Sequence, residues 1–440
     1  MSPQSRYGWR VPMPKQELKP LKVACFVGNG FDLGLGLDTG YRDFLSKFLA
    51  NRSSNYPARD WLVDQISRKV EDWGDAEAAF GQLQFSKQGG DVLRLYLDSE
   101  RAFQEELESF LKYEETRLNI TEEKSSEVAR ELLRYFSGLL DCCLDEPDKK
   151  KLAYVMNGSK EVEFNFINFN YTHTLDRLLG LNVKASANGN KQKLNATFEK
   201  GGRKYRIGQI LHPHGSLGNN AIFGVAHSRQ IGDAKLLEYS NNAGYFVKSR
   251  MAEGLVPDYD STERLLSTCD VMILFGVSYG TTDEHWWNMI SRIIVVQETM
   301  VVVNRYMKSK ICVLCPFSFN PQIPVTPSDK LYFRKKEIDR FLKGMGDIDE
   351  QVVGEAVRKN CALITYGPYQ DPINLKLYYC DPLHLKSFGR RFVNKYFEKD
   401  DLCMAKSRNS SVQNAIEASN AIARQRGIGV FDQSMQCMQR

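Results

Sequence analysis

The stretch Val-Ala-Cys-Phe-Val-Gly-Asn-Gly-Phe-Asp, residues 23–32, decides how this chain folds. Its first five residues are a continuous apolar run, which is typical of a short strand that a sheet buries on both faces. The run stops at Gly28, and the Gly28-x-Gly30 spacing resembles half of a dinucleotide-binding fingerprint, whose glycines let the backbone approach a pyrophosphate. The next glycines, Gly34 and Gly36, do not complete that fingerprint. A tight strand-to-helix turn is therefore an equally good interpretation of the same residues.

Other apolar runs along the chain predict more strands of the same kind. They are residues 164–169, 271–275, 301–303 and 311–314. Helical patterns separate them, for example where apolar residues recur at positions 103, 107, 110 and 111. Alternating strands and helices are typical of a doubly wound, mostly parallel sheet, so we predict an α/β protein with a Rossmann-like core.

Changes in composition suggest how the chain is divided. Residues 1–20 have the character of an N-terminal tail, and residues 21–315 carry the strands of the predicted nucleotide-binding domain. Within that domain, residues from about 45 to 150 are charged and helical, which predicts an insertion or lid of about four helices. The polar stretch 184–206 is expected to be an exposed hairpin or loop. The pattern weakens after residue 316, so residues 316–440 are assigned to a C-terminal α/β extension.

The bulk composition excludes several classes of protein. Hydrophobic residues make up 42% of the chain and charged residues 26%, as in ordinary globular proteins. The net charge is +5, from 59 basic and 54 acidic residues. This is too close to balance to indicate a surface that binds nucleic acid. We expect neither a signal peptide nor a membrane span, because no apolar run is long enough. The ten cysteines are scattered, which favours reduced thiols and a cytoplasmic protein.

Polar residues follow the predicted strands, at the ends where an open α/β sheet binds ligands. Asn170 follows the run at 164–169, and His214 lies between Pro213 and Gly215. The Asn170 amide could hold a sugar hydroxyl or an attacking water, or it could simply form a turn. His214 is a candidate general base because a free imidazole titrates near neutral pH, although a histidine that only caps a loop has the same sequence signature.

Two patterns raise the possibility of a metal site. His212, His214 and His227 could supply imidazole ligands, but Pro213 disrupts the strand geometry that would align the first two. The Cys312-x-x-Cys315 pair has no second pair at the spacing of a zinc ribbon, so we expect it to lie in the core. No metal is predicted.

The loop at residues 276–280 allows a different chemistry. Its Gly-Val-Ser-Tyr-Gly sequence matches the nucleophile elbow of serine hydrolases, and Ser278, Asp381 and His384 follow the chain order of a hydrolase triad. In an elbow, however, the helix begins at the nucleophile, whereas the helix-start signals here begin at Thr281. A serine hydrolase therefore remains a lesser alternative.

Taken together, these blocks resemble the AbiH family of bacterial phage abortive-infection proteins. The residues that carry the resemblance lie in four blocks: 27–44, 168–175, 214–217 and 276–287. The match spans about residues 21–305, and its first two blocks are the most specific. Residues 316–440 lie outside it.

The same order of blocks resembles, more distantly, the sirtuin-like NAD-binding domains. Here Asp32 stands in place of a serine in the glycine loop. Thr172 stands where the Asn-x-Asp motif of those domains has its acid, which removes a carboxylate from the ribose pocket. The paired Cys-x-x-Cys module of protein deacylases is missing, which argues against a deacylase.

These resemblances imply an enzyme that uses NAD as its substrate or ligand. Asn170 and His214 would be the catalytic pair of an NAD glycohydrolase. The implied nucleotide-binding residues are Gly28, Asn29, Gly30, Phe31, Asp32, Tyr171, Gly276, Ser278 and Asp283. The nicotinamide of NAD is already a cationic leaving group, so its release needs no acid, only an anchored nucleotide and a positioned water.

The resemblance also bears on regulation and partners. Activity would be held in check until infection, by the helical lid or by assembly into a homo-oligomer, and a phage-derived trigger or a defence partner would release it. A second hypothesis is a module that binds a nucleotide signal without turnover, which the missing acid at Thr172 favours. Neither a membrane nor a nucleic acid is an expected partner.

Overall fold

The computed structural model of this chain describes the core and most of the helices around it. The described residues are 19–50, 56–69, 73–118, 129–130, 132–134, 136–138, 146–157, 159–180, 196–244, 246–306, 327–345 and 350–366. Their strands are β1 (Leu21–Val27), β2 (Glu161–Asn168), β3 (Thr197–Lys200), β4 (Arg203–Leu211), β5 (Val271–Phe275), β6 (Met300–Tyr306) and β7 (Cys361–Tyr366).

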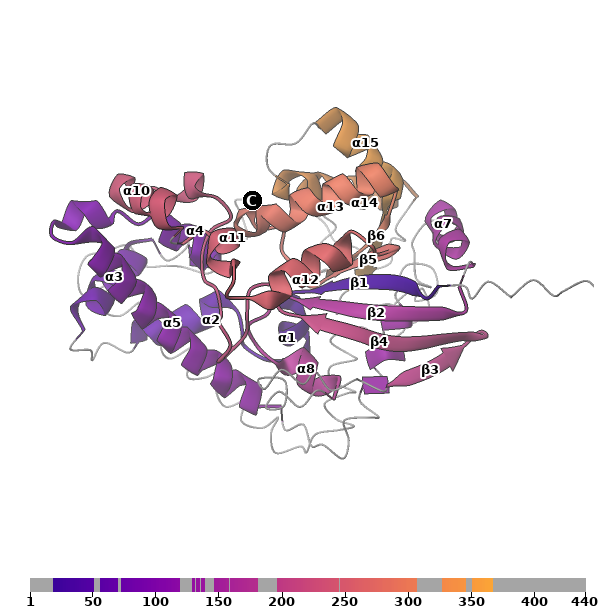
Figure 1. Ribbon diagram of the computed structural model, residues 1–440, viewed down its shortest axis with the longest axis horizontal. Coiled ribbons are helices and arrows are strands. Elements are labelled where there is room, and N and C mark those ends of the chain that lie inside the picture. Colours follow the sequence, from indigo (N-terminus) through magenta and orange to yellow (C-terminus); the bar gives the residue numbers. More distant parts are fainter. Residues whose placement is uncertain are drawn as a thin grey trace, which may run out of the picture.

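The described strands form one seven-stranded sheet in the order β3-β4-β2-β1-β5-β6-β7 (Figure 1). Only the β3–β4 pair is antiparallel. The parallel strands, renumbered along the chain, run 3-2-1-4-5-6, which is the order of a doubly wound sheet. The predicted mixed α/β fold with a mostly parallel sheet is confirmed. Successive strands are added on one side of β1 as far as β4 and on its other side from β5 onward, so the direction of winding reverses between β1 and β5.

Helices cover both faces of the sheet, because alternate residues of the buried strands point to opposite sides. In β1, Val23 and Cys25 belong to one core, and Ala24 and Phe26 belong to the other. The helices of the first core are α1 (Gly30–Leu35), α7 (Glu146–Asn157) and α8 (Thr174–Leu178). Those of the second are α12 (Pro257–Leu266), α13 (Glu284–Gln297), α14 (Pro327–Gly344) and α15 (Glu350–Asn360).

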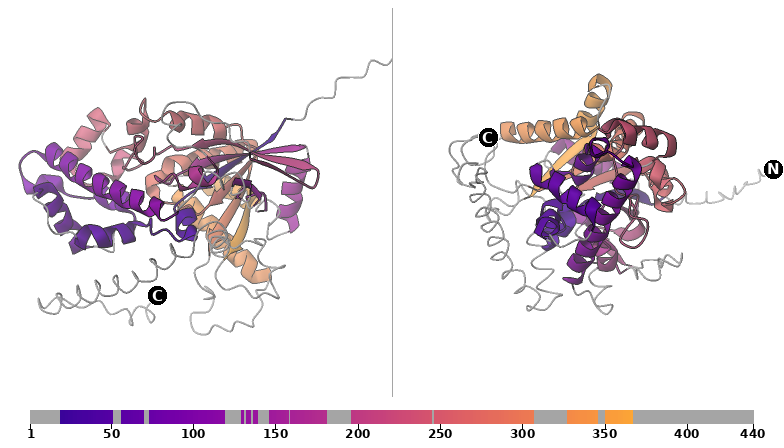
Figure 2. Two further views of the ribbon diagram at one scale, coloured as in Figure 1. Left: turned by 90° about the horizontal axis from the view of Figure 1, so that it is seen from below. Right: turned by 90° about the vertical axis from the view of Figure 1, so that its left-hand side faces the viewer.

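A helical lobe lies beyond the carboxyl ends of the strands (Figures 1 and 2). It contains α2 (Tyr41–Ala50), α3 (Pro57–Arg68), α4 (Ala76–Gly81), η2 (Phe85–Gln88) and α5 (Val92–Thr116). It also takes in α10 (Ala234–Ala243), which comes from much later in the sequence. A third core, rich in aromatic rings such as Phe44, Phe80 and Phe103, holds these helices together.

The helical block that the sequence places at about 45–150 divides in space. Its first part builds the lobe, as the aromatic spacing in α5 suggests, because Phe103, Leu107 and Phe110 are all buried there. Its second part packs on the sheet instead: Leu132, Phe136 and the residues of α7 join the core next to β1 and β2. Apolar periodicity predicts that a helix is amphipathic, but it does not say which partner buries its apolar face.

Several other expectations can be compared with the structure. The strand expected at 271–275 is β5, and the one expected at 301–303 lies within β6. The expected hairpin at 184–206 corresponds in its described part to the antiparallel β3–β4 pair. The predicted strand at 311–314, the Cys312–Cys315 pair, Asp381 and His384 lie outside the described residues.

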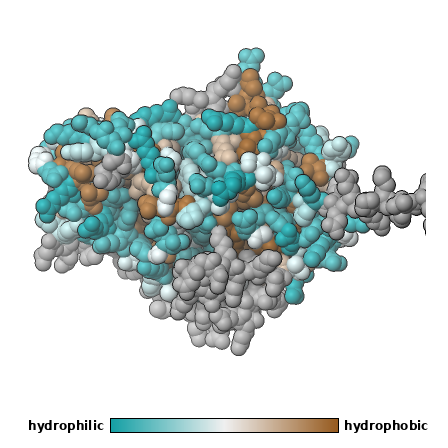
Figure 3. Space-filling view, in the orientation of Figure 1, coloured by the Kyte–Doolittle hydropathy of each residue, from teal (hydrophilic) through white to brown (hydrophobic). Residues whose placement is uncertain are grey.

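The surface of the described residues is ordinary for a folded chain. The face shown in Figure 3 is largely hydrophilic, and its hydrophobic residues gather in small patches, one of them near α15. Exposed apolar side chains include Val296 on α13 and Val352 on α15. None of the helices in the described part of the chain combines the length and the apolarity that a membrane-crossing helix needs.

Candidate functional site

The two glycine loops pack directly against each other where the sheet reverses its winding. The Gly28 amide donates to Phe275 O at 3.0 Å, and the Gly30 amide donates to Gly276 O at 2.8 Å. A Cβ on Gly30 would lie only 2.6 Å from Gly276 Cα, and Gly276 has a φ of +63°. This close approach requires glycine at both loops. Mutual packing therefore explains these glycines, and their predicted contact with a phosphate stays a prediction.

Two asparagine side chains fix the position of the first glycine loop. Asn29 Nδ2 donates to Thr39 O at 3.1 Å, and its Oδ1 accepts from Thr39 Oγ1 at 2.5 Å. Asn170 Nδ2 donates to Gly28 O at 3.3 Å, and its backbone amide donates to Asn168 Oδ1 at 3.1 Å. Both amides thus hold the loop from within the protein, which is the role of a structural asparagine at a strand end.

Asp32, in the first turn of α1, is fully buried. Its Oδ2 accepts from Thr172 Oγ1 at 2.6 Å, while its Oδ1 is buried without a hydrogen-bond partner. Burial raises its pKa to about 7; the Thr172 bond lowers it, and Glu115 and Asp176 raise it. The Thr172 hydroxyl therefore pairs with a buried carboxyl group that comes from position 32. Phe31 beside it is a core residue that contacts Phe275.

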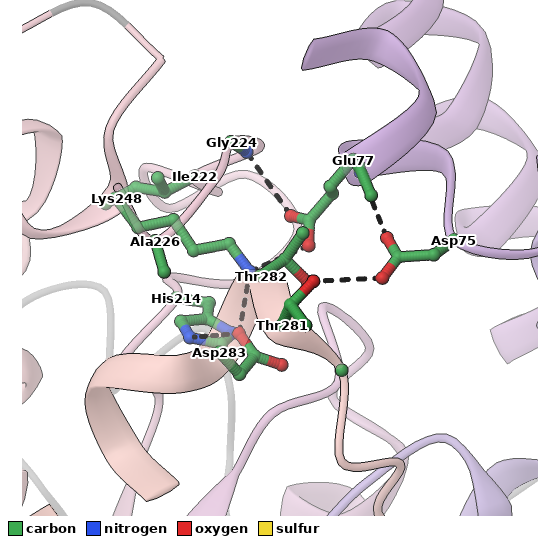
Figure 4. Close-up of polar contacts among 12 residues, drawn as sticks. Asp75, Glu77, His214, Ile222, Gly224, Ala226, Lys248, Thr281, Thr282 and Asp283 are labelled. Atoms are coloured by element: carbon green, nitrogen blue, oxygen red, sulfur yellow. Dashed lines mark hydrogen bonds and ion pairs between the residues drawn. The ribbon is translucent and has the colours of Figure 1, made fainter. Parts of the chain in front are cut away.

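The clearest electrostatic feature is a buried lysine shared by two carboxylates (Figure 4). Lys248, the first residue of α11 (Lys248–Ala252), is 5% exposed. Its Nζ lies 2.7 Å from Glu77 Oε2 and 2.7 Å from Asp283 Oδ1. Glu77 belongs to α4 in the lobe, whereas Asp283 follows β5 in η4 (Thr281–Asp283). The network thus connects the lobe to the loops at the carboxyl edge of the sheet.

The three charges of this network titrate differently because of their surroundings. Burial raises the pKa of Glu77 to about 7, although Lys248 opposes the shift and Asp283 adds to it. Burial also works against ionised Asp283, but Lys248 outweighs it and the pKa of Asp283 is lowered. For Lys248, burial is outweighed by the two carboxylates, and its pKa is raised. At neutral pH, Lys248 and Asp283 are therefore charged, and Glu77 is poised to gain or lose a proton.

Glu77 and its neighbour Asp75 make further contacts that fix the network. The Tyr171 hydroxyl lies 3.1 Å from Glu77 Oε1 and 2.6 Å from Ile222 O, and the Gly224 amide donates to Glu77 Oε1 at 3.3 Å. Asp75 caps α4 by accepting from the Ala78 amide at 3.1 Å. Its other oxygen accepts from Thr282 at 3.5 Å, so α4 is joined to the loop after β5 in a second place.

His214 lies beside this network in a hydrophobic setting. Its ring stacks on Phe169 with the centroids 4.7 Å apart, and its Nε2 accepts from Trp286 Nε1 at 3.2 Å. The same Nε2 is 3.4 Å from Asp283 Oδ1. Burial, aided by Lys248, lowers the pKa of His214 to about 3, against the weaker opposing effect of Asp283. Burial therefore disfavours the charged form of this imidazole, and its role as a general base stays a prediction.

The three histidines considered as metal ligands are each paired with a different carboxylate. His212 Nε2 is 3.0 Å from Asp176 Oδ2, and His227 Nε2 is 3.6 Å from Glu284 Oε2. Burial lowers the pKa of His212, but Asp176 raises it more, so its net shift is upward. Among the residues that the structure describes, no group of three or more His, Cys, Asp or Glu side chains could hold a metal ion.

Ser278 is exposed in the second glycine loop. The α-helix after it, α13, begins only at Glu284, so Ser278 does not have the helix-start position of a nucleophile elbow. The neighbouring Tyr279 packs against Phe341 of α14, and Trp287 Nε1 donates to Gly280 O at 3.0 Å. Both tryptophans after the loop, Trp286 and Trp287, are buried in the core.

The structure thus brings together some of the predicted site residues and adds others. Tyr171, His214 and Asp283 lie at one buried network, whereas Asn170 lies where the two glycine loops meet. The sequence patterns marked neither Glu77 nor Lys248 as a site residue. The acid was visible as part of an Asp-x-Glu pair at a helix start, but no sequence signal marked Lys248.

Comparison with known proteins identifies the family. No curated protein matches the chain in sequence. The family described as "Bacteriophage abortive infection AbiH" matches residues 25–305, which contain the carboxyl end of β1, the strands β2 to β5, the lobe and the whole charged network. Since this match covers well over half of the chain, the protein belongs to the AbiH family of bacteriophage abortive-infection proteins.

Proposed function

We propose that this abortive-infection protein binds NAD or a related nucleotide at the carboxyl edge of its sheet and hydrolyses the N-glycosidic bond. Membership in the AbiH family supports the role in phage defence. One observation carries the finer proposal: Lys248, Glu77 and Asp283 meet at the carboxyl ends of the strands, close to where the winding reverses. That edge is where open α/β sheets bind ligands.

The network supplies the carboxylates that glycosidic chemistry requires. In the proposed reaction the bond from ribose C1 to the base nitrogen breaks, and its electron pair stays with the base. Water adds to C1, and one of its protons passes to a basic side chain. Asp283, which stays ionised, would stabilise the oxocarbenium-like transition state. Glu77, with a pKa of about 7, is suited to accept the proton near neutral pH.

Asn170 and His214 keep supporting roles in this proposal. Asn170 fixes the backbone of Gly28, which the nucleotide would approach. His214 is held by Phe169 and Trp286 at 3.4 Å from Asp283, so it would limit the space around that carboxylate. Burial lowers the pKa of His214 to about 3, which favours Glu77 over His214 as the group that takes the proton from water.

The test is nicotinamide release from NAD by the full-length protein. We expect release to fall by about a hundredfold or more in Glu77→Gln and Asp283→Asn. Glu263→Gln, which changes a partly exposed acid that lies 2.9 Å from His285, is the matched control and should keep full activity. NAD loss is also measured for the same variants in bacteria during phage infection. This second assay detects activity that needs a signal from the infecting phage. Unchanged NAD consumption in both network variants would refute the proposal.

A second candidate is a nucleotide-binding module without turnover. The burial of the network favours it, since Lys248, Glu77 and His214 are 5%, 6% and 4% exposed. Calorimetry that finds NAD binding, with no nicotinamide release in the purified protein or in infected cells, would select this candidate. Labelling by a fluorophosphonate probe that is lost in Ser278→Ala would instead select a serine hydrolase.

A further inference from the structure

A small pocket lies between α5 and the loop that follows β4. Its volume is about 190 Å³. The residues that line it are Gln104, Leu107, Glu108, Leu111, Tyr171, Leu217, Gly218, Asn219, Asn220, Ala221 and Phe223. Tyr171 is the one lining residue among those predicted to contact a nucleotide, so the pocket adds a surface that the sequence did not suggest.

The lining favours a flat ring over a phosphate. Leu107, Leu111 and Phe223 are buried apolar residues, whereas Gln104 and Asn219 offer side-chain amides. The described lining residues include no lysine or arginine, and the single acid, Glu108, is 2.6 Å from Lys112. The pocket is also smaller than the roughly 300–1,000 Å³ of sites for whole drug-sized ligands. One ring with a hydrogen-bonding substituent therefore suits it better than a complete dinucleotide.

The loop that forms one side of the pocket is already held in shape. Ser216 and Asn219 exchange backbone hydrogen bonds of 3.1 and 2.8 Å, and the Leu217 amide donates to Tyr171 O at 2.8 Å. Asn220 Nδ2 donates to Leu255 O at 2.9 Å. A pocket whose walls are ordered before binding costs less conformational entropy when a ligand enters.

Tyr171 connects this pocket to the charged network. It lines the pocket, and its hydroxyl lies 3.1 Å from Glu77 Oε1. A ring bound in the pocket would therefore be separated from Glu77 by a single side chain. This places the pocket next to the groups that are proposed to act on the glycosidic bond.

We propose that this pocket holds the nicotinamide ring of NAD, the base that leaves when the bond to ribose breaks. The ring enters as a cation, for which the aromatic faces of Tyr171 and Phe223 are favourable neighbours. Its carboxamide matches the amides of Gln104 and Asn219. The electron pair of the broken bond neutralises the ring, which weakens its attraction to these faces and favours release. This inference rests on the proposed function.

The test fills the pocket and compares two ligands by calorimetry. Gln104→Trp places a large side chain at the pocket, and Glu105→Trp places the same side chain on the exposed face of α5 as the control. NAD carries nicotinamide, whereas ADP-ribose lacks it. We expect Gln104→Trp to weaken NAD binding by about tenfold or more and to leave ADP-ribose binding within about twofold. Glu105→Trp should change neither, and retained ADP-ribose binding shows that each variant is folded.

Asn219→Trp, on the opposite side of the pocket, gives a second variant with the same expected result. Wild-type NAD affinity in both pocket variants would overturn the inference while leaving the proposed function intact. An equal loss for NAD and ADP-ribose would also overturn it, because the ring would not be the group recognised. A wild-type protein that binds neither compound would overturn both this inference and the proposed function.

Discussion

Lys248 is the residue on which the candidate site depends most. It is a buried cation between Glu77 and Asp283, and a buried charge is tolerated only when it is paired. The same arrangement depresses the pKa of Asp283, so the lysine sets the charge of the site as well as its geometry. Substitutions at Lys248 and at Asp32 test these buried charges directly.

Replacing Lys248 by methionine should destabilise the protein strongly. The change keeps the length of the side chain but leaves Glu77 and Asp283 without their shared cation. Loss of one partner from a buried ion pair costs about 3–5 kcal/mol. Urea unfolding should show this loss, and Lys235→Met, at an exposed position of α10, should stay within about 0.5 kcal/mol of wild type.

The double variant Lys248→Met/Glu77→Gln provides the internal check. It removes one of the two orphaned carboxylates, so it should recover part of the lost free energy of unfolding. If Lys248→Met alone is as stable as wild type, the buried network described above does not exist in solution.

Asp32→Asn should change how stability depends on pH. The folded-state pKa of Asp32 is raised from 3.8 to about 7, so the folded protein keeps a proton that the unfolded chain loses. Its contribution therefore becomes less favourable as pH rises from about 4 to 7, by up to roughly 4 kcal/mol. Asparagine removes that titration. The Tm of Asp32→Asn, measured relative to wild type, should be higher at pH 8 than at pH 5.

The control for this prediction is Asp260→Asn, which changes an exposed aspartate of α12. Its Tm difference from wild type should be nearly the same at the two pH values. A Tm difference for Asp32→Asn that is independent of pH would mean that the Asp32 carboxyl is not held protonated by burial.

At the scale of elements, the loops after β1 and β5 are built as one unit. Hydrogen bonds join Gly28 to Phe275 and Gly30 to Gly276, so the register of the two strands continues past their ends. This contact explains why both loops are glycine-rich although they are about 250 residues apart in the sequence. The backbone around the proposed nucleotide site is therefore fixed by strand pairing before any ligand binds.

Gly30→Ala should disrupt this unit. The added Cβ would lie 2.6 Å from Gly276 Cα and 2.8 Å from Gly276 O, and backbone atoms cannot move aside cheaply. We expect a loss of about 1–3 kcal/mol in thermal or urea unfolding. Gly138→Ala is the matched control, because a Cβ there meets no atom within 4 Å. An equal effect of the two substitutions would contradict the loop contact.

On the scale of the whole molecule, the described residues form three cores. Two lie on the faces of the sheet, and the third lies within the lobe. The charged network sits where the third core meets the sheet, between α4 and η4. The lobe could therefore loosen without unfolding the sheet, and the site would lose Glu77 when it did.

Phe80→Ala tests whether the lobe is a cooperative unit of its own. Phe80 is fully buried and contacts several aromatic rings, including Phe103 and Phe246. Its removal should cost about 3–5 kcal/mol. Hydrogen exchange should accelerate in α3, α4 and α5 while β1 and β5 keep their protection.

Tyr154→Ala serves as the control, since this side chain is 83% exposed. It should leave both stability and exchange close to wild type. Uniform acceleration over the lobe and the sheet in Phe80→Ala would show that the two unfold together and would contradict the separate third core.

The amino-acid sequence was sufficient to predict the mostly parallel sheet and the loops at the carboxyl ends of its strands. Buried parallel strands need continuous apolar runs, so β1, β5 and β6 could be located from residues 23–27, 271–275 and 301–303. The loops after them could be predicted because glycine adopts backbone conformations that other residues rarely reach. The same blocks carried the family resemblance, which the match over residues 25–305 bears out.

The electrostatics of the candidate site and the packing partners of the helices depend on contacts between distant parts of the chain, which no local sequence pattern encodes. In the sequence, a lysine at 248 and an acid at 77 look like ordinary solvated charges, and nothing there pairs them with Asp283, because burial and pairing are properties of the folded chain. The pKa of His214 falls for the same reason: its neighbours come from three other parts of the chain. Likewise, the periodicity of residues 45–150 predicted helices, but three-dimensional packing assigned some to the lobe and others to the sheet.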